Sequence, residues 1–259
     1  DGVTGTDDDG LEAFIAAGVI QDTMVKTLDN GLKVGIMGLL GNTAENDAPL
    51  APPVTFDHDY AFIQQKVDYL KNEMGAHIVV ALSHSGITDP DTSPGGDDIA
   101  LAQNVDGIDI IASGHEHEQT DSIVMENGTR IICAGNYGRN LAELNVTVEV
   151  GSGITAATLT NHAINDSTPG DPSMNYIMEM IDAGINEAIE PQLGLEINDV
   201  IAASGSDNLT TSYGGAEENG MGNLVSDSLR YMLGGMSGAV GIVAGGVVRN
   251  SFDLAQQIS

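Results

Sequence analysis

The sequence predicts an α/β fold: a layered β-sandwich flanked by helices and followed by the start of a second α/β domain. Near-continuous apolar runs at 32–40 and 76–84 are typical of strands buried on both faces of a parallel sheet. Segments with a helical spacing of apolar residues separate the early strands, and strand-like runs follow one another later. Strand–helix–strand order followed by successive strands favours layered α/β packing.

The first helix is expected after the strand at 32–40, over residues 59–74. Asp57 or Asp59 would cap this helix, and Gly75 would end it. Its apolar face is predicted to comprise Phe62, Val67, Leu70 and Met74.

Further strands are expected after the run at 76–84. A short helix over 97–103 leads into a third apolar run at 108–113. Three more strand-like runs follow, at 129–136, 142–150 and 154–164. Alternation in the last two runs predicts antiparallel or edge pairing with one solvated face.

A domain boundary is predicted at 165–172, NDSTPGDP. A helix over 173–189 is expected to end at Glu190-Pro191, and the sequence then becomes Gly-rich. A helix at 218–233 and a strand and turn at 238–250 are expected there. We therefore divide the chain into a first domain (1–165), a linker and connecting helix (166–190) and the beginning of a second domain (191–259).

The chain is strongly acidic, with 38 Asp and Glu against 8 Lys and Arg and a formal net charge of −30. Such a surface repels nucleic acid and anionic membranes, so neither is an expected partner. With 41% apolar residues, the acidic excess favours a globular protein adapted to a salty medium over a disordered one. A phosphate substrate would need a local positive charge such as a metal ion.

Cysteine and apolar content limit other classes of protein. Cys133 is the only cysteine, which excludes an intrachain disulfide, and its setting RIICAG predicts a small buried strand residue. No stretch approaches about 20 uninterrupted apolar residues, so no membrane insertion is expected.

Histidines end two of the predicted strands. His84 closes ALSH, and His115 and His117 follow IDIIASG about 30 residues later. A right-handed strand–helix–strand unit would bring both ends to the carboxyl edge of one sheet, where open α/β sheets hold ligands. Neutral imidazole is the commonest metal ligand, so the three histidines are candidate metal ligands.

The stretches LSHSG, GIDIIASGHEHE and AGNYGRNLAELNVTV resemble the second half of a calcineurin-like metallophosphoesterase domain, specifically of the 5′-nucleotidase family. Downstream, ENGMGNLVSDSL and GGVVRNS resemble the separate C-terminal substrate domain of that family. The resemblance implies the metallophosphoesterase type of layered sandwich and, from residue 191, the start of the substrate domain.

The resemblance also implies two divalent metal ions, zinc, manganese or similar, with a bridging hydroxide that attacks phosphorus. His84 and His115 would ligate one metal and His117 the other. Arg249 matches a phosphate-binding arginine of the family, and an ordinary surface role is the alternative. Asn136 is expected to line the metal cleft or to serve only as a turn residue.

Three motifs of the family are missing from this sequence: Asp-x-His, a Gly-Asp with the bridging carboxylate, and Gly-Asn-His with the catalytic histidine. Their place would lie before Asp1, so the catalytic residue is expected upstream and the chain is interpreted as a fragment. FDHDY (56–60) and TNHAI (160–164) are not expected to be ligands, because they fall at a helix start and in an alternating strand. His58 and His77 are expected to be structural or solvated, and Asp97, Asp98 and Asp106 to lie at caps and turns.

The function implied is hydrolysis of nucleotide phosphate monoesters, or of 2′,3′-cyclic nucleotides, in an extracellular or periplasmic location. Two alternatives remain open. One is a sulfur-oxidation thiohydrolase of the same fold, because the segment before GNL lacks the arginine that the family places there. The other is an inactive acidic extracellular binding or surface protein, and three histidines holding a single zinc would fit a half-built site.

Overall fold

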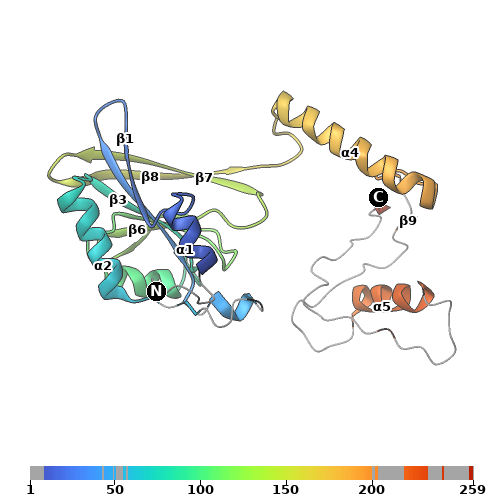
Figure 1. Cartoon of the computed structure of the whole chain (residues 1–259), viewed down its shortest axis with the longest axis horizontal. Coiled ribbons are helices and arrows are strands. Elements are labelled where there is room, and N and C mark those ends of the chain that lie inside the picture. The colour runs from blue at the N-terminus through green and yellow to red at the C-terminus, as the bar shows by residue number, and fades with distance from the viewer. Residues whose placement is uncertain are drawn as a thin grey trace. The chain divides into compact units, whose positions relative to one another are not determined.

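The computed structural model describes residues 9–42, 44–48, 50, 55, 56, 58–199, 202, 203, 219–232, 241, 257 and 258. The chain forms two compact units, residues 1–168 and 169–259. The first unit is a mixed α/β fold with a six-stranded sheet and a two-stranded hairpin (Figure 1).

The central sheet has the strand order β1-β2-β3-β4-β6-β5. The strands β2, β3, β4 and β6 are parallel neighbours, and β1 and β5 add antiparallel edges. The first unit comprises α1 (Asp9–Ala16), β1 (Thr23–Thr27), β2 (Lys33–Leu40), a 3₁₀ helix (Ala44–Asp47), α2 (Tyr60–Asp68), a π-helical turn (Tyr69–Glu73), β3 (Ile78–His84), α3 (Asp97–Asn104), β4 (Ile110–Ser113), β5 (Val124–Glu126), β6 (Thr129–Cys133), β7 (Asn140–Glu149) and β8 (Gly153–Ala163).

The predicted parallel strands are confirmed. Strand β3 pairs with β2 on one side and with β4 on the other, and it buries Ile78, Val79 and Ala81. The segment between β3 and β4 contains α3, as the strand–helix–strand interpretation requires. Cys133 is buried at the end of β6, also as predicted. The edges were not predicted: β1 and β5 are short, and α1 precedes the first apolar run.

Helices α2 and α3 cover one face of the sheet and form the main core with it. The buried side chains of this core include Ile63, Val67, Leu70, Leu101 and Val105 from the helical side and Met37, Val79, Ala81, Ile111 and Ile131 from the sheet. These side chains fill the space between the layers, and apolar burial of this kind supplies the main driving force for folding.

The predicted apolar face of the first helix is partly wrong. Phe62 is 53% exposed and Met74 is 41% exposed, whereas Ile63 is buried together with Val67 and Leu70. Spacings of four and three residues place 63, 67 and 70 on one helical stripe, and Phe62 falls outside that stripe. Asp59 caps the helix as predicted, accepting a hydrogen bond of 3.0 Å from the Phe62 backbone N–H. Asp57 lies outside the described residues.

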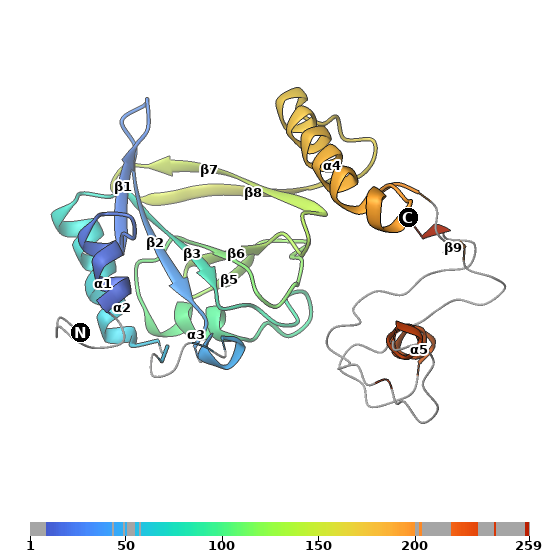
Figure 2. The ribbon, with the colours of Figure 1, turned by 45° about the vertical axis from the view of Figure 1, so that its right-hand side comes forward.

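The hairpin β7–β8 lies over the opposite face of the sheet, as Figure 2 shows. Side chains along β7 alternate between half-buried and exposed, in agreement with the predicted solvated face. Several polar contacts attach the hairpin. Asn161 Nδ2 donates to the Thr120 carbonyl at 2.8 Å, Asn140 Nδ2 donates to Gln119 Oε1 at 2.7 Å, and the Arg130 guanidinium donates to the Ile154 carbonyl at 3.2 Å. The first unit therefore has three layers: helices, sheet and hairpin.

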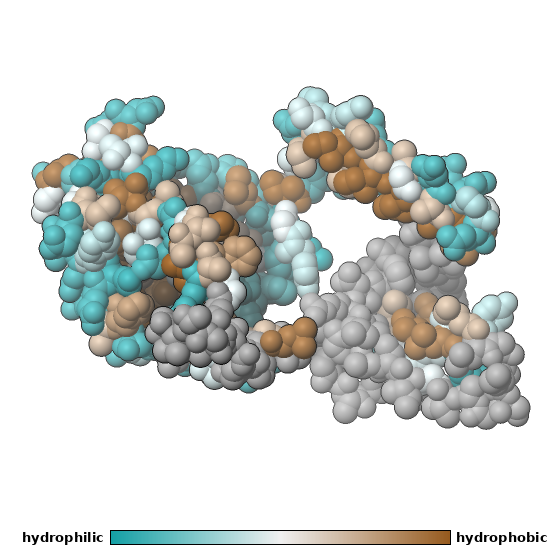
Figure 3. All heavy atoms as spheres, in the orientation of Figure 1, coloured by the Kyte–Doolittle hydropathy of each residue, from teal (hydrophilic) through white to brown (hydrophobic). Residues whose placement is uncertain are grey.

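The second unit contains α4 (Pro172–Leu193), α5 (Gly220–Met232) and the short paired strands β9 (Ala202–Ala203) and β10 (Gln257–Ile258). Helix α4 does not end at Glu190-Pro191 as predicted but at Leu193, where Gly194 adopts a left-handed conformation and donates to the Glu190 carbonyl. A proline in the last turn removes one hydrogen bond without ending the helix. None of the residues of α4 is buried, and apolar side chains gather along one side of it (Figure 3).

Candidate metal centre at the carboxyl edge of the sheet

The structure brings His84 and His115 together. His84 is the last residue of β3, and His115 follows the end of β4 by two residues, so both leave the carboxyl edge of neighbouring parallel strands. Their ring centroids are 5.2 Å apart, with the rings tilted by 65°. Both side chains are exposed to solvent.

Backbone geometry at Gly114 permits this approach. A Cβ atom at this position would lie 3.2 Å from His84 Nδ1, closer than an ordinary contact. His115 has a φ of 83° and His117 a φ of 62°, both in the left-handed region that side chains other than glycine rarely adopt. Such conformations concentrate at functional sites, where the surrounding structure maintains them against a cost of about 1–3 kcal/mol each.

His117 lies against Tyr137, with ring centroids 5.0 Å apart, and the Arg139 guanidinium lies 5.5 Å above the same tyrosine ring. Tyr137 also has a positive φ, 53°, in the turn in which the Arg139 N–H donates to the Asn136 carbonyl at 3.1 Å. The structure thus pairs His84 with His115 and places His117 beside the β6–β7 turn. Among the residues that the structure describes, no three or more His, Cys, Asp or Glu side chains form a group set to hold a metal ion.

A pocket of about 480 Å³ opens beside the two neighbouring histidines. His84 and His115 line it together with the carboxylates Asp97 and Glu116, and none of the lysines or arginines that the structure describes is among its lining residues. Imidazole and carboxylate are the donor types that divalent cations take, while among the described residues these side chains form no group of three or more that could hold a cation. A bare phosphate would be repelled by the two carboxylates.

A network of buried polar side chains lies beside the pocket, at the ends of β3 and β4. Its central residue is Asp98, whose role the sequence did not predict. Asp98 was expected at a cap or turn, yet it is fully buried and accepts hydrogen bonds from the Ser83 and Ser113 hydroxyls, each at 2.6 Å. Burial raises the pKa of the Asp98 carboxyl, against hydrogen bonds that lower it. Two strand-end serines facing an acidic helix start were the available sequence signal.

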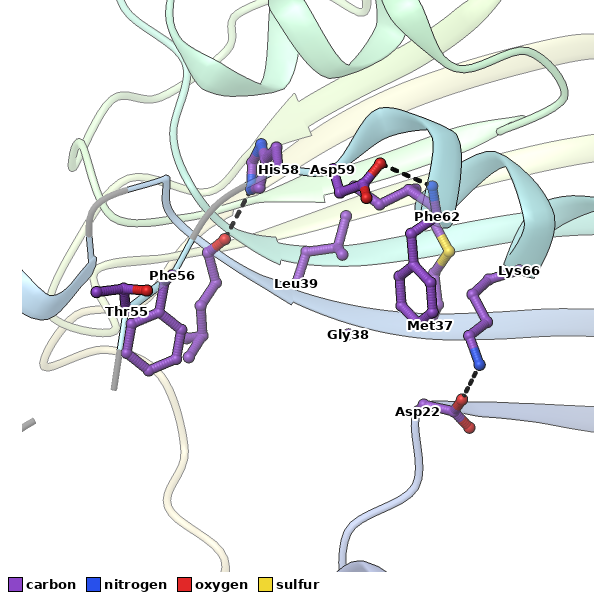
Figure 4. Close-up of a pocket in the computed structure, with 12 residues that line it drawn as sticks. Asp22, Met37, Gly38, Leu39, Thr55, Phe56, His58, Asp59, Phe62 and Lys66 are labelled. Carbon is purple, nitrogen blue, oxygen red and sulfur yellow. Dashed lines mark hydrogen bonds and ion pairs between the residues drawn. The ribbon is translucent and has the colours of Figure 1, made fainter. Parts of the chain in front are cut away.

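His58 extends this network toward β2. Its Nε2 lies 2.8 Å from the Leu40 carbonyl and 3.3 Å from the Ser85 hydroxyl. Figure 4 shows His58 among the residues of the neighbouring pocket. Because a carbonyl only accepts, Nε2 is the donor in the contact with Leu40. Nδ1 is buried without a hydrogen-bond partner. The expectation that His58 is structural holds for its anchoring of the Leu40 carbonyl.

The remaining candidates divide into three groups. Asn136 opens the turn that carries Tyr137, one residue from the ring that contacts His117. His162, in TNHAI, pairs with Glu143 at 2.7 Å on the exposed side of the hairpin. Arg249 lies outside the described residues.

His77 and Cys133 are structural. His77 Nδ1 accepts the Lys33 N–H at 2.9 Å at the opposite end of β3. Burial raises the pKa of the Cys133 thiol, which therefore stays protonated and unreactive. Within the described ranges, no helix combines the length and the apolar character needed to cross a bilayer.

Comparison with known proteins identifies several that are similar to this chain in sequence or in fold. The trifunctional nucleotide phosphoesterase protein YfkN of Bacillus subtilis is 24% identical over 234 residues, covering 86% of this chain and 15% of the relative. The 5′-nucleotidase precursor from Thermus thermophilus matches in structure with a TM-score of 0.67 at 21% identity, covering 93% of this chain and 48% of that one.

A second solved structure, the sulfate thiohydrolase SoxB from Thermus thermophilus in complex with glycerol, has a TM-score of 0.60 at 21% identity. It covers 83% of this chain and 36% of that one. No family model matches the chain. The chain thus spans less than half the length of each of these three proteins.

The sequence and the fold are distantly similar to those of the calcineurin-like phosphoesterase class. Within that class, this chain is a distant homologue of the 5′-nucleotidases, as the resemblance of its motifs implied.

Proposed function

We propose that this chain forms part of a metal-dependent phosphoesterase that hydrolyses nucleotide phosphate monoesters outside the cytoplasm. The adjacency of the His84 and His115 imidazoles in an acidic pocket carries this proposal. The relatedness to a nucleotide phosphoesterase and to a 5′-nucleotidase supports the choice of substrate class.

His84 and His115 would hold one divalent cation, and His117 would contribute to a second. When bound, such cations neutralise phosphate charge and lower the pKa of a coordinated water. Asp97 and Glu116 favour the cations through their charge and oppose a phosphate that arrives without them. His117 and Tyr137 form the side of the site nearest the β6–β7 turn, where a substrate group can contact the exposed tyrosine ring. Arg249 would bind phosphate from the second domain.

The test is release of inorganic phosphate from a panel of 5′-nucleotides by the protein encoded in the complete open reading frame, with Zn²⁺ or Mn²⁺ and with EDTA. His115→Ala should lower the rate by orders of magnitude, because a lost ligand removes the cation. His162→Ala is the matched control, since it removes an exposed imidazole from the hairpin and should leave the rate unchanged. Full activity of His115→Ala would contradict the site assignment.

Sulfur-ester hydrolysis is the second candidate. No arginine occurs between residues 211 and 219, directly before the GMGNL segment, and the fold also matches the thiohydrolase SoxB. Turnover of a sulfate thioester, without release of phosphate from nucleotides, would favour sulfur-ester hydrolysis. Binding of nucleotide with no turnover of either substrate would instead indicate a binding protein on the same scaffold.

A further inference from the structure

One buried carboxylate connects the two strand ends that carry His84 and His115. Asp98 lies in the first turn of α3 and is 0% exposed. Its Oδ1 accepts from the Ser83 hydroxyl, and its Oδ2 accepts from the Ser113 hydroxyl and, at 3.2 Å, from the Gly86 N–H. Ser83 of β3 and Ser113 of β4 are direct partners in the parallel pairing, so the carboxylate spans this pair.

Each group that donates to Asp98 lies within two residues of a site histidine. Ser83 directly precedes His84, and Gly86 follows it by two residues. Ser113 precedes His115 by two residues. The Asp98 N–H also donates to the Gly86 carbonyl at 3.0 Å, so the loop after β3 is held in both directions. The carboxylate therefore sets the relative positions of both histidine-bearing segments.

The chemistry of this contact favours an acceptor without protons of its own. Two hydroxyls and one amide converge on the two carboxylate oxygens, and the ionised carboxylate offers acceptor sites to all three. An asparagine of the same size would turn an N–H₂ group toward at least one of these donors. Acidic residues in the first turn of a helix also interact favourably with its dipole, which helps to maintain the charge in a buried place.

The network also reaches the third strand of the rim. Ser83 is within hydrogen-bond distance of the Ser85 hydroxyl, at 2.8 Å, and Ser85 contacts His58 Nε2. His58 in turn contacts the Leu40 carbonyl at the end of β2. Three parallel strands therefore have their carboxyl ends joined through one chain of hydrogen bonds that begins at Asp98.

We propose that Asp98 is a positioning residue that holds the His84 and His115 imidazoles at the spacing at which they bind one divalent cation. It acts through Ser83, Ser113 and Gly86 and touches neither imidazole in the contacts described. The inference rests on the proposed function in one respect, that a cation binds these two histidines.

The experiment uses the 259-residue chain and two measurements. The first is the nuclear Overhauser effect between the His84 and His115 rings without metal, which reports their spacing independently of any cation. The second is calorimetric titration with Zn²⁺. We expect Asp98→Ala to abolish the ring contact and Asp98→Asn to weaken Zn²⁺ binding at least tenfold. Asp91→Asn, which removes an exposed carboxylate from the same loop, should change the affinity by less than twofold.

Folding is monitored by circular dichroism in the same samples. If the Asp98 variants have a lower melting temperature but keep both the ring contact and the Zn²⁺ affinity, Asp98 has only a structural role. That result would overturn the proposal. If Asp98→Ala does not fold, Ser83→Ala and Ser113→Ala each remove one donor and should each weaken binding several-fold, and wild-type affinity in both would overturn it. Loss of the ring contact in a chain that binds no Zn²⁺ would support the positioning role and refute the cation site of the proposed function.

Discussion

Replacing Gly114 with alanine tests whether the close approach of two strand ends sets the geometry of the candidate metal centre. The added Cβ would lie 3.2 Å from His84 Nδ1 and 3.6 Å from the Ser83 carbonyl oxygen. Gly114 is not among the described residues with positive φ, so alanine introduces no backbone strain there. The substitution therefore acts on the His84 ring, which must move by a few tenths of an ångström.

A displacement of this size exceeds the tolerance of about 0.2 Å in metal–ligand distances. We expect Zn²⁺ binding to weaken roughly tenfold, about 1.4 kcal/mol, while the free energy of unfolding changes by less than about 1 kcal/mol. Gly128→Ala is the opposite control. Its φ is 83° and its Cβ would meet no atom within 4 Å, so it should lower stability by roughly 1–2 kcal/mol and leave Zn²⁺ affinity unchanged.

Calorimetry with Zn²⁺ and urea unfolding followed by circular dichroism measure the two effects separately. Wild-type affinity in Gly114→Ala, with unchanged ring resonances of His84, would refute the reasoning. Such a result would mean that Zn²⁺ binding tolerates a shift of the His84 ring, or that this ring is free to move at the carboxyl edge of the sheet.

Three further predictions concern stability. Ile111 of β4 is fully buried, so Ile111→Ala should lower the free energy of unfolding by about 2–5 kcal/mol and Ile111→Val by about 0.5–1.5 kcal/mol. Urea titrations measure both values, and nearly equal losses would contradict close packing around this side chain. Burial raises the pKa of the Asp98 carboxyl above 3.8, so the folded protein takes up a proton before the unfolded chain does as the pH falls. The free energy of unfolding of wild type should therefore rise relative to that of Asp98→Asn as the pH falls from the raised pKa toward 3.8. A difference between the two proteins that does not change with pH would contradict the raised pKa. Raising NaCl from about 0.1 M to about 1 M shortens the Debye length from about 10 Å to about 3 Å, so the melting temperature of a chain with net charge −30 should rise, and a fall would contradict this.

Periodicity predicted the parts of the fold that are buried on two sides. The runs at 32–40 and 76–84 are confirmed as β2 and β3, because a central parallel strand needs apolar residues at nearly every position. The edge strands β1 and β5 carry no such run, since they are paired on one side only, and their short sequences do not differ from loops. Phe62 shows the same limit within a helix: an apolar residue one position off the buried stripe cannot be told from a core residue by composition.

The candidate site divides in the same way. That His84 and His115 would meet followed from strand ends and the handedness of the crossover, which are general properties of parallel sheets. The placement of His117 beside Tyr137 depends on left-handed backbone at both residues, and no pattern in the sequence specifies such conformations outside glycine. Asp98 could not be separated from its neighbour Asp97, because two adjacent acidic residues at a helix start are equally plausible caps until the structure shows which one points inward.

This difference between Asp97 and Asp98 separates a carboxylate that stabilises the fold from one that lines the pocket. The Asp98 carboxylate accepts hydrogen bonds from the Ser83 hydroxyl and its neighbours at the strand ends. Asp97 instead lines the pocket with Glu116 and the paired histidines. Screening by salt weakens the field of the many surface carboxylates but weakens that of partly enclosed groups much less. At high salt the half-buried Asp97 should therefore keep more of its attraction for divalent cations than the exposed carboxylates of the surface, Glu116 among them. Zn²⁺ binding that declined with NaCl as steeply as nonspecific binding to the surface would contradict this separation.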